Sequence, residues 1–276
     1  MKHVLSTHLF VNHRLTTALL GKVQQAGIPE VEIYCARQHL DYRDKAQIAE
    51  LSHWFRDSDL KLHSLHSPMY TDEIWGRSGP HAVVTLTHTV KGERLKAVDE
   101  VKRTLEIAES IPFRYLVQHL GVSGEEFDLR KVDAAFAALE ELKIFAGQRR
   151  VEILLENTPN EFSSAARLMM FDELTHLGLN FVFDVGHANL NEGVETAFGL
   201  MKDRIRSTHL HDNDGKADQH LFPTMSEEGT IDWKKSMELL RGGGDRYPLL
   251  LELKDQPELG NALEAVKQVF DRLEQL

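Results

Sequence analysis

The segment 206–220 is rich in side chains that can bind a metal ion. His209 and His211 are two residues apart, and residues with that spacing on an extended strand point to the same side. Asp218 and His220 repeat the spacing a few residues later. Imidazole and carboxylate groups that converge from one face bind divalent cations. The segment therefore predicts a metal site.

Most other candidate ligands stand at the ends of short apolar runs. Glu156 and Glu252 each follow three aliphatic residues, and an unpaired carboxylate buried there would carry a large desolvation penalty. Lys and Arg are not enriched beside these positions, so a metal ion is the simplest common partner. The candidates are His66, His119, Glu156, Asp184, His187, His211, Asp218, His220 and Glu252.

The remaining histidines are weaker candidates for metal binding. We expect His63 and His209 to support ligands through hydrogen bonds rather than to bind metal. His8 and Arg37 follow the first two apolar runs and are candidates for substrate contact or for positions on the rim. We expect solvated or structural roles for His3, His13, His39, His53, His81, His88 and His176.

Apolar runs alternate with amphipathic stretches along the chain, which is typical of a parallel sheet with crossover helices. The predicted strands cover residues 4–10, 31–36, 60–66, 115–119, 151–156, 181–184, 205–211 and 249–253. The predicted helices include 94–108, 132–145, 163–177 and 262–273, where apolar residues recur three and four apart. This pattern predicts an α/β fold, a single (β/α)8 TIM barrel domain over residues 1–276, whose length suits that fold.

In such a barrel the active site lies at the carboxyl ends of the strands, which is where most of the candidate ligands fall. The longest connection between a strand and a helix runs from Ser67 to Lys91 and contains Trp75 in a glycine-rich stretch, 75–80. We expect this stretch to form a lid over the site, with Trp75 excluding water.

Composition limits the class of protein. Of 276 residues, 42% are hydrophobic and 27% charged, which is typical of a globular protein. The one cysteine, Cys35, excludes an intrachain disulfide, and its apolar neighbours favour a buried structural role. No run approaches a membrane span and the start lacks a secretory signal, so we expect a cytoplasmic enzyme. The net charge of −11 weakly disfavours a polyanionic partner.

At these residues the chain resembles the xylose-isomerase-like barrel superfamily, which contains sugar phosphate isomerases and epimerases and the endonuclease IV group (AP endonuclease family 2). The resemblance covers nearly the whole chain. The matching motifs are Leu155-Glu156-Asn157, Asp184-Val-Gly-His187, His209-Leu-His-Asp-Asn-Asp-Gly, Asp218-Gln-His220 and Gly229-Thr-Ile-Asp-Trp233.

The resemblance implies a metal-dependent sugar isomerase or epimerase. The pattern of the epimerase branch places one divalent ion on Glu156, Asp184, His211 and Glu252, with Glu156 and Glu252 as the acid–base pair around an enediolate. We expect His187 to take part in catalysis at a substrate oxygen or to bind a further metal. Such a set suits zinc, manganese, cobalt, magnesium and iron, of which we favour zinc and manganese.

Other activities fit the same ligands. The pattern of the endonuclease IV group holds three zinc ions and falls on all nine candidates, so a zinc phosphodiesterase acting on abasic DNA is an alternative. An inosose-type dehydratase and a sugar-binding barrel without turnover are others. The flanking residues favour the isomerase branch, because Asp184-Val-Gly-His187 lacks the cysteine of the endonuclease motif and an Asn-Asp-Gly replaces its Asn-Asp-Ser.

The loop after the seventh predicted strand also bears on the partner. It contains one lysine, Lys216, against Asp212, Asp214, Asp218, Glu227 and Glu228, and that acidity would repel a DNA duplex. We therefore expect a small carbohydrate substrate, with no nucleic acid or membrane partner, and leave oligomerisation open.

Overall fold

The eight strands lie side by side in the order β7-β6-β5-β4-β3-β2-β1-β8, and each pairs in parallel with its neighbours. Between β7 and β8 the pairing is reduced to a bridge from Leu210 to Leu251, where the amide of Leu210 donates to the carbonyl of Leu250 at 2.8 Å. This bridge completes the ring. The predicted (β/α)8 TIM barrel is therefore confirmed.

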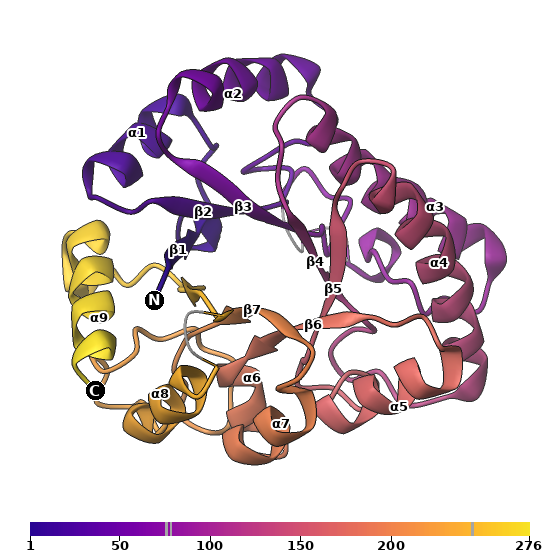
Figure 1. Ribbon diagram of the computed structural model, residues 1–276. Helices are drawn as coiled ribbons and strands as arrows, with labels where there is room; N and C mark the ends of the chain where they lie inside the picture. The colour runs from indigo at the N-terminus through magenta and orange to yellow at the C-terminus, as the bar shows by residue number, and fades with distance from the viewer. Residues whose placement is uncertain (75–76, 78, 244–245) are drawn as a thin grey trace.

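Helices surround the barrel in this computed structural model, which describes residues 1–74, 77, 79–243 and 246–276 (Figure 1). The strands are β1 His3–Ser6, β2 Glu30–Tyr34, β3 Lys61–His66, β4 Tyr115–His119, β5 Glu152–Glu156, β6 Asn180–Asp184, β7 Ile205–His209 and β8 Leu249–Leu251. The α-helices are α1 Thr17–Gln25, α2 Lys45–Asp57, α3 Lys91–Glu106, α4 Leu129–Gly147, α5 Ala165–Thr175, α6 Val185–Leu190, α7 Val194–Met201, α8 Trp233–Arg241 and α9 Ala262–Gln275.

Strand alternation explains why polar residues at strand ends face the interior. In β5, Ile153 and Leu155 belong to the large apolar core between strands and helices. Leu154 belongs to a separate cluster with residues of β4 and β6. Because side chains alternate along a strand, Glu156 faces the same side as Leu154, and it is fully buried. The sequence therefore places a carboxylate at the last inward position of this strand.

Four predicted strands extend too far: the first by four residues, and the second, seventh and eighth by two each, since these end at Tyr34, His209 and Leu251. Residues 7–10 were predicted as strand but form a 3-10 helix, Thr7–Phe10. It begins there because the hydroxyl of Ser6 accepts a hydrogen bond from the amide of His8, at 3.4 Å, which turns the chain. The seventh strand ends at His209 instead of at residue 211. His211 therefore lies beyond the regular ladder, next to the single bridge of Leu210.

Two segments of the long connection after β3 pair with each other through backbone hydrogen bonds. Tyr70 and Val83 form an antiparallel bridge, and the amide of Thr71 donates to the carbonyl of Ala82 at 2.8 Å. Trp75 and the side chain of His81 lie outside the described residues. A lid over the site therefore stays a prediction.

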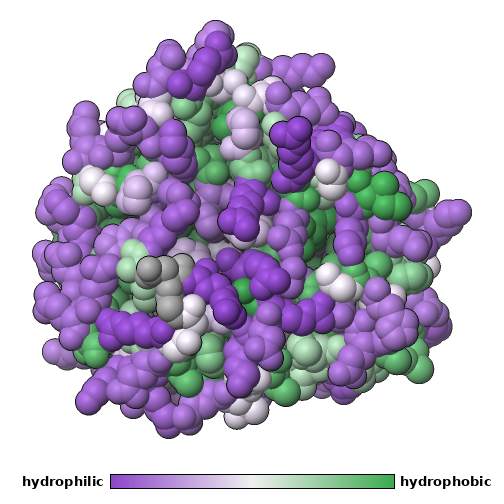
Figure 2. Space-filling view, viewed as in Figure 1, coloured by the Kyte–Doolittle hydropathy of each residue, from purple (hydrophilic) through white to green (hydrophobic). Residues whose placement is uncertain are grey.

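The surface seen in Figure 2 is mainly hydrophilic, with apolar side chains in small patches between polar ones. Among the described helices, none is both long enough and apolar enough to cross a membrane. The apolar residues of this chain serve chiefly the core around the barrel.

Two side chains that we expected to be structural, Cys35 and His39, are buried. Burial raises the pKa of the Cys35 thiol, which suits a small apolar residue rather than a nucleophile. His39 Nδ1 lies 2.6 Å from the carbonyl oxygen of His13. Burial lowers the pKa of His39 from 6.5 to about 4 despite this hydrogen bond.

We expect His39 to destabilise the fold in acid. Between pH 6.5 and 4 the unfolded chain binds a proton at this residue that the folded chain does not. The free energy of unfolding therefore falls as the pH is lowered through this window, by up to about 3 kcal/mol. Urea unfolding across this range should show a smaller fall in His39→Gln than in the wild type. The exposed His53 provides the control, His53→Gln, and equal slopes for all three proteins would contradict the prediction.

Candidate metal centre

The predicted ligands gather at the carboxyl end of the barrel in three groups. Within each group, the ligand atoms lie within 4.8 Å of one another. The first group is His66, His119 and Glu156; the second is Glu156, Asp184, His209 and Glu252; the third is His187, His211, Asp218 and His220. All nine predicted ligands are present, His209 is added to them, and Glu156 belongs to two groups.

The first group has the spacing of a tetrahedral site. His66 Nε2 and His119 Nε2 are 3.2 Å apart, and Glu156 Oε2 lies 3.1 Å from His119 Nε2 and 3.5 Å from His66 Nε2. Ligands about 2.0–2.1 Å from a tetrahedral zinc ion are separated by about 3.3 Å. The three atoms therefore fit three corners of a tetrahedron and leave the fourth corner for another ligand.

The second group is the most deeply buried. His209 Nδ1 lies 3.1 Å from Glu156 Oε1, 3.3 Å from Glu252 Oε2 and 3.8 Å from Asp184 Oδ2. The side chains come from β5, β6 and β7 and from just beyond β8, and each is at most 2% exposed. The family resemblance implies His211 as the histidine of this ion, with a supporting role for His209. The structure instead places His209 among the three carboxylates.

The third group lies beside the second. Asp218 Oδ2 is 3.2 Å from His187 Nε2, and Asp218 Oδ1 is 3.4 Å from His220 Nε2. The rings of His211 and His220 stack with their centroids 3.9 Å apart. His211 Nε2 lies 3.2 Å from Asp184 Oδ2, so this histidine connects the third group with the second.

The second nitrogen of several histidines is held by a backbone carbonyl. His66 Nδ1 lies 2.9 Å from the carbonyl of Ser67, His187 Nδ1 3.0 Å from that of Asn157, and His220 Nδ1 2.9 Å from that of Glu252. A carbonyl oxygen only accepts, so Nδ1 carries the proton and the lone pair of Nε2 faces the group. Histidines that bind metals are commonly held in this way.

Charge also fits a cation at these positions. Burial raises the pKa of Glu156, but the neighbouring His209 and His119 outweigh it and hold the pKa well below its usual range. Burial lowers the pKa of His209, but Glu252 and Glu156 raise it well above the usual value. The carboxylates therefore require positive charge, which protonated histidines or divalent cations supply. Glu252 Oε1 is also buried without a hydrogen-bond partner among the described residues.

A buried carboxylate that we had not singled out for this role holds the loop of Asp218 and His220. Asp212 accepts hydrogen bonds from Trp233 Nε1 at 2.6 Å and from the amide of Ile231 at 3.2 Å. A Cβ atom at residue 229 would lie 2.4 Å from Asp212 Oδ2, so this position requires glycine. The acidity that we expected to repel DNA is smaller than the sequence suggests, because Asp212 is buried and Asp218 belongs to the third group.

His8 and Arg37, the candidates for substrate contact, and His63, expected to support a ligand, occupy different places, and the expectation for His63 is wrong. His8 lies next to the third group, with its ring centroid 4.8 Å from that of His220. The guanidinium of Arg37 binds both carboxylate oxygens of Asp41, at 3.2 and 3.1 Å. His63 is bound to Glu30 at 3.0 Å, away from the three groups.

Two residues of β2 near the centre were missed. Glu32 is fully buried, and its carboxylate lies 3.2 Å from His209 Nε2. The ring of Tyr34 stacks on His66, with centroids 4.4 Å apart. A signal for Glu32 was present, because an acidic residue stands between Val31 and Ile33 in an apolar run.

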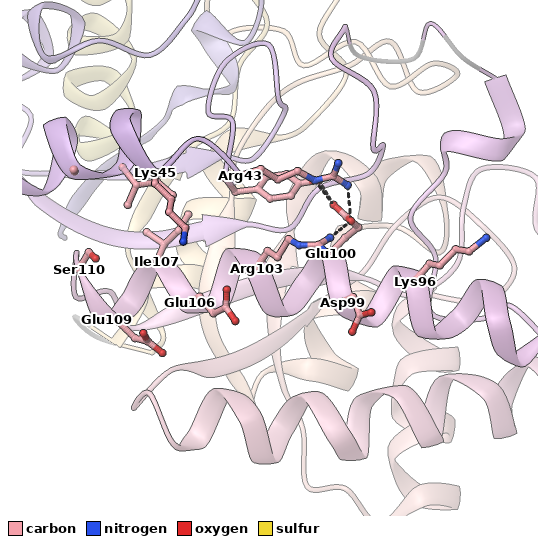
Figure 3. A pocket seen from close by; sticks show the side chains of 13 residues that line it. Arg43, Lys45, Lys96, Asp99, Glu100, Arg103, Glu106, Ile107, Glu109 and Ser110 are labelled. Atoms are coloured by element: carbon pink, nitrogen blue, oxygen red, sulfur yellow. Dashed lines mark hydrogen bonds and ion pairs between the residues drawn. The ribbon is translucent and has the colours of Figure 1, made fainter.

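A groove of about 760 Å³ lies elsewhere, outside the barrel between α2 and α3. Figure 3 shows Arg43 and Arg103 directed at Glu100 on its wall, and both form ion pairs with that carboxylate. The hydroxyl of Tyr42 also donates to Glu100, at 2.8 Å. Since these charges are paired and none of the three ligand groups lies here, we place the chemistry at the end of the barrel.

Two glycines provide a test of packing against His211. A Cβ atom at Gly186 would lie 2.1 Å from His211 Cε1, whereas one at Gly199 would meet nothing within 4 Å. We expect Gly186→Ala to lower the free energy of unfolding by roughly 1–3 kcal/mol through overpacking. Gly199→Ala, in the helix α7, should raise it by about 0.5–1 kcal/mol through helix propensity. Chemical denaturation measures both, and equal effects would contradict the packing of His211 on Gly186.

Sequence comparison identifies the family of the chain. A family described as xylose isomerase-like TIM barrel matches residues 20–276. MJ1614, an uncharacterized protein of Methanocaldococcus jannaschii, is 31% identical over 150 residues, which are 53% of this chain and 59% of that protein. The chain thus matches about three fifths of the length of this relative.

Solved structures of the same fold include sugar epimerases. A D-tagatose 3-epimerase-like protein has a TM-score of 0.78 and 21% identity, and the match covers 100% of this chain and 99% of that one. An L-ribulose 3-epimerase has a TM-score of 0.76 and 17% identity, with 99% and 93% covered. The IolI protein with a bound zinc atom has a TM-score of 0.76 and 17% identity, with 99% and 96% covered. At these identities the likeness establishes the fold.

Proposed function

The chain belongs to the xylose isomerase-like TIM barrel family, and from that premise we propose that it is a divalent-metal-dependent isomerase or epimerase of a sugar, sugar phosphate or polyol ketone. One observation carries this proposal. Glu156 ends β5 and Glu252 follows β8. Both carboxylates lie beside the same nitrogen of His209, Nδ1, at 3.1 and 3.3 Å. Two carboxylates that face one ion suit transfer of a proton away from and back to a substrate carbon.

Glu156, Asp184, His209 and Glu252 would hold the ion, with zinc or manganese favoured among the divalent metals. A bound divalent ion polarises the adjacent carbonyl and hydroxyl oxygens of a substrate. One of the two glutamates would remove the proton next to the carbonyl, and the other would deliver a proton to the enediolate. Trp75, in the predicted lid, would exclude water.

His187 would contact a substrate oxygen or bind a further ion. Its Nδ1 lies 3.2 Å from Glu156 Oε1, and its Nε2 lies 3.2 Å from Asp218 Oδ2. This histidine therefore links Glu156 of the proposed proton-transfer pair to Asp218 of the third group, where it can orient the reacting end of a sugar.

Exchange of protons with solvent tests the proposal directly. Protein loaded with Mn²⁺ or Zn²⁺ should catalyse incorporation of deuterium from D₂O next to the carbonyl of at least one ketose, with formation of its isomer or epimer. Glu252→Gln should lose the exchange while still binding the sugar. A metal-loaded protein that binds ketoses without exchanging their protons would instead be a sugar-binding barrel. Loss of water from an inosose would identify a dehydratase.

The presence of the first and third ligand groups favours a second function. Together with the second group they offer places for three ions, two of which would share Glu156, and this suits a zinc phosphodiesterase of the endonuclease IV type. Elemental analysis and an abasic DNA substrate separate the two functions. About one ion per chain, with a preference for Mn, Co or Mg, supports the isomerase. Three zinc ions with cleavage at an abasic site would overturn it.

A further inference from the structure

Glu32 occupies a buried position behind the second ligand group. It comes from the middle of β2 and is fully buried. Its Oε1 lies 3.2 Å and its Oε2 3.3 Å from His209 Nε2. The hydroxyl of Ser64, on the neighbouring strand β3, donates to Oε2 at 2.8 Å. We infer that Glu32 is a positioning residue, which sets the tautomer of His209 and strengthens its binding of the metal ion.

The two nitrogens of His209 have different surroundings. Nε2 faces the carboxylate of Glu32 and Nδ1 faces the second group. A carboxylate accepts hydrogen bonds, so Glu32 favours the tautomer in which Nε2 carries the proton. The lone pair of Nδ1 is then directed at the space between Glu156 and Glu252. In the other tautomer the lone pair of Nε2 would face the oxygens of Glu32, an unfavourable contact between two acceptors.

The burial of Glu32 indicates a specific role. An ionised carboxylate buried without compensation carries a large desolvation penalty. Among the described residues, the only ion pair of Glu32 is with His209, whereas Glu30 on the same strand pairs with both Lys2 and His63. The imidazole of His209 is therefore the nearest route by which compensating charge reaches Glu32. A cation on Nδ1 supplies such charge.

The effect of such a hydrogen bond on metal affinity has a known size. Removing the partner behind a metal-binding histidine typically lowers metal affinity 10- to 100-fold. The substitution Glu32→Gln keeps the shape and an acceptor oxygen but removes the charge. We expect it to weaken the binding of one Zn²⁺ ion by about that factor.

Equilibrium dialysis against buffered Zn²⁺, with elemental analysis of the protein, tests the inference. Glu32→Gln should release one ion at about 10- to 100-fold higher free Zn²⁺ than the wild type does. Glu30→Gln is the matched control, because Glu30 also lies on β2 and binds a histidine, His63, that belongs to none of the ligand groups. Its binding curve should overlay that of the wild type. A Glu32→Gln curve that also overlays the wild type would overturn the inference.

A second measurement needs no variant. Nitrogen-15 NMR of histidines in the Zn²⁺-loaded wild type should show His209 protonated at Nε2, whereas protonation at Nδ1 would overturn the inference. The inference rests on the metal site proposed above, and the two can fail separately. A wild type that binds no Zn²⁺ refutes the site, while tight binding that is insensitive to Glu32→Gln refutes only the role of Glu32.

Discussion

Replacing Glu156 with glutamine is expected to lower kcat/KM roughly a thousand-fold or more on any sugar that the wild type isomerises. Glu156 is proposed as one member of the proton-transfer pair, and such groups typically contribute about 10²- to 10⁴-fold. It also belongs to two of the three ligand groups. The variant should therefore lose bound metal as well as activity, and elemental analysis alongside steady-state kinetics measures both.

A control for Glu156→Gln comes from the same strand. Glu152 also faces inward but lies at the opposite end of β5, where its carboxylate accepts a hydrogen bond from Asn180 Nδ2 at 2.5 Å. Glu152→Gln should retain the metal content and turnover of the wild type. Full activity in Glu156→Gln would refute both the acid–base assignment and the shared-ligand role.

Removal of divalent metal is expected to lower the melting temperature by about 10 °C. An ion present at about 1,000 times its dissociation constant stabilises a fold by about 4 kcal/mol, and each kcal/mol shifts the melting temperature of a protein of this size by about 2–4 °C. The physical reason is the set of buried carboxylates, Glu156, Asp184 and Glu252, which lose their compensating charge. Thermal unfolding followed by circular dichroism, with and without a chelator, measures the shift.

Two further results would support the loss of the metal ion as the cause of that shift. Zn²⁺ added back to the stripped protein should restore the melting temperature, and the chelator should affect Glu156→Gln much less than the wild type. Identical melting curves with and without the chelator would mean that no ion contributes to stability at this end of the barrel.

The fold was largely predictable from sequence, because the alternation of apolar runs and amphipathic stretches fixes both the kind and the order of the elements. The strand 115–119 was predicted with the bounds that the structure shows. The largest boundary error occurs where a local hydrogen bond overrides an apolar run. The hydroxyl of Ser6 ends β1 in this way, although Leu9 and Phe10 continue the pattern.

The grouping of the ligands was less predictable. Two histidines separated by one residue share a face, so spacing alone does not tell whether His209 or His211 meets the carboxylates of the second group. That choice depends on where β7 stops and on the ring of His211, which packs over Gly186. Glu32 was overlooked because its partner, His209, lies 177 residues away in sequence.

The pairing of β1 with β8 bears on how the protein is assembled. β8 delivers Glu252, and its register with β1, Leu5 opposite Leu251, joins the first strand to the last. Domains form as units, and the earlier part of a chain leaves the ribosome first. The three other members of the second group come from β5, β6 and β7, so the group is complete only when the last strand has joined the ring. An ion in the second group would therefore require the closed ring, with β8 paired to β1.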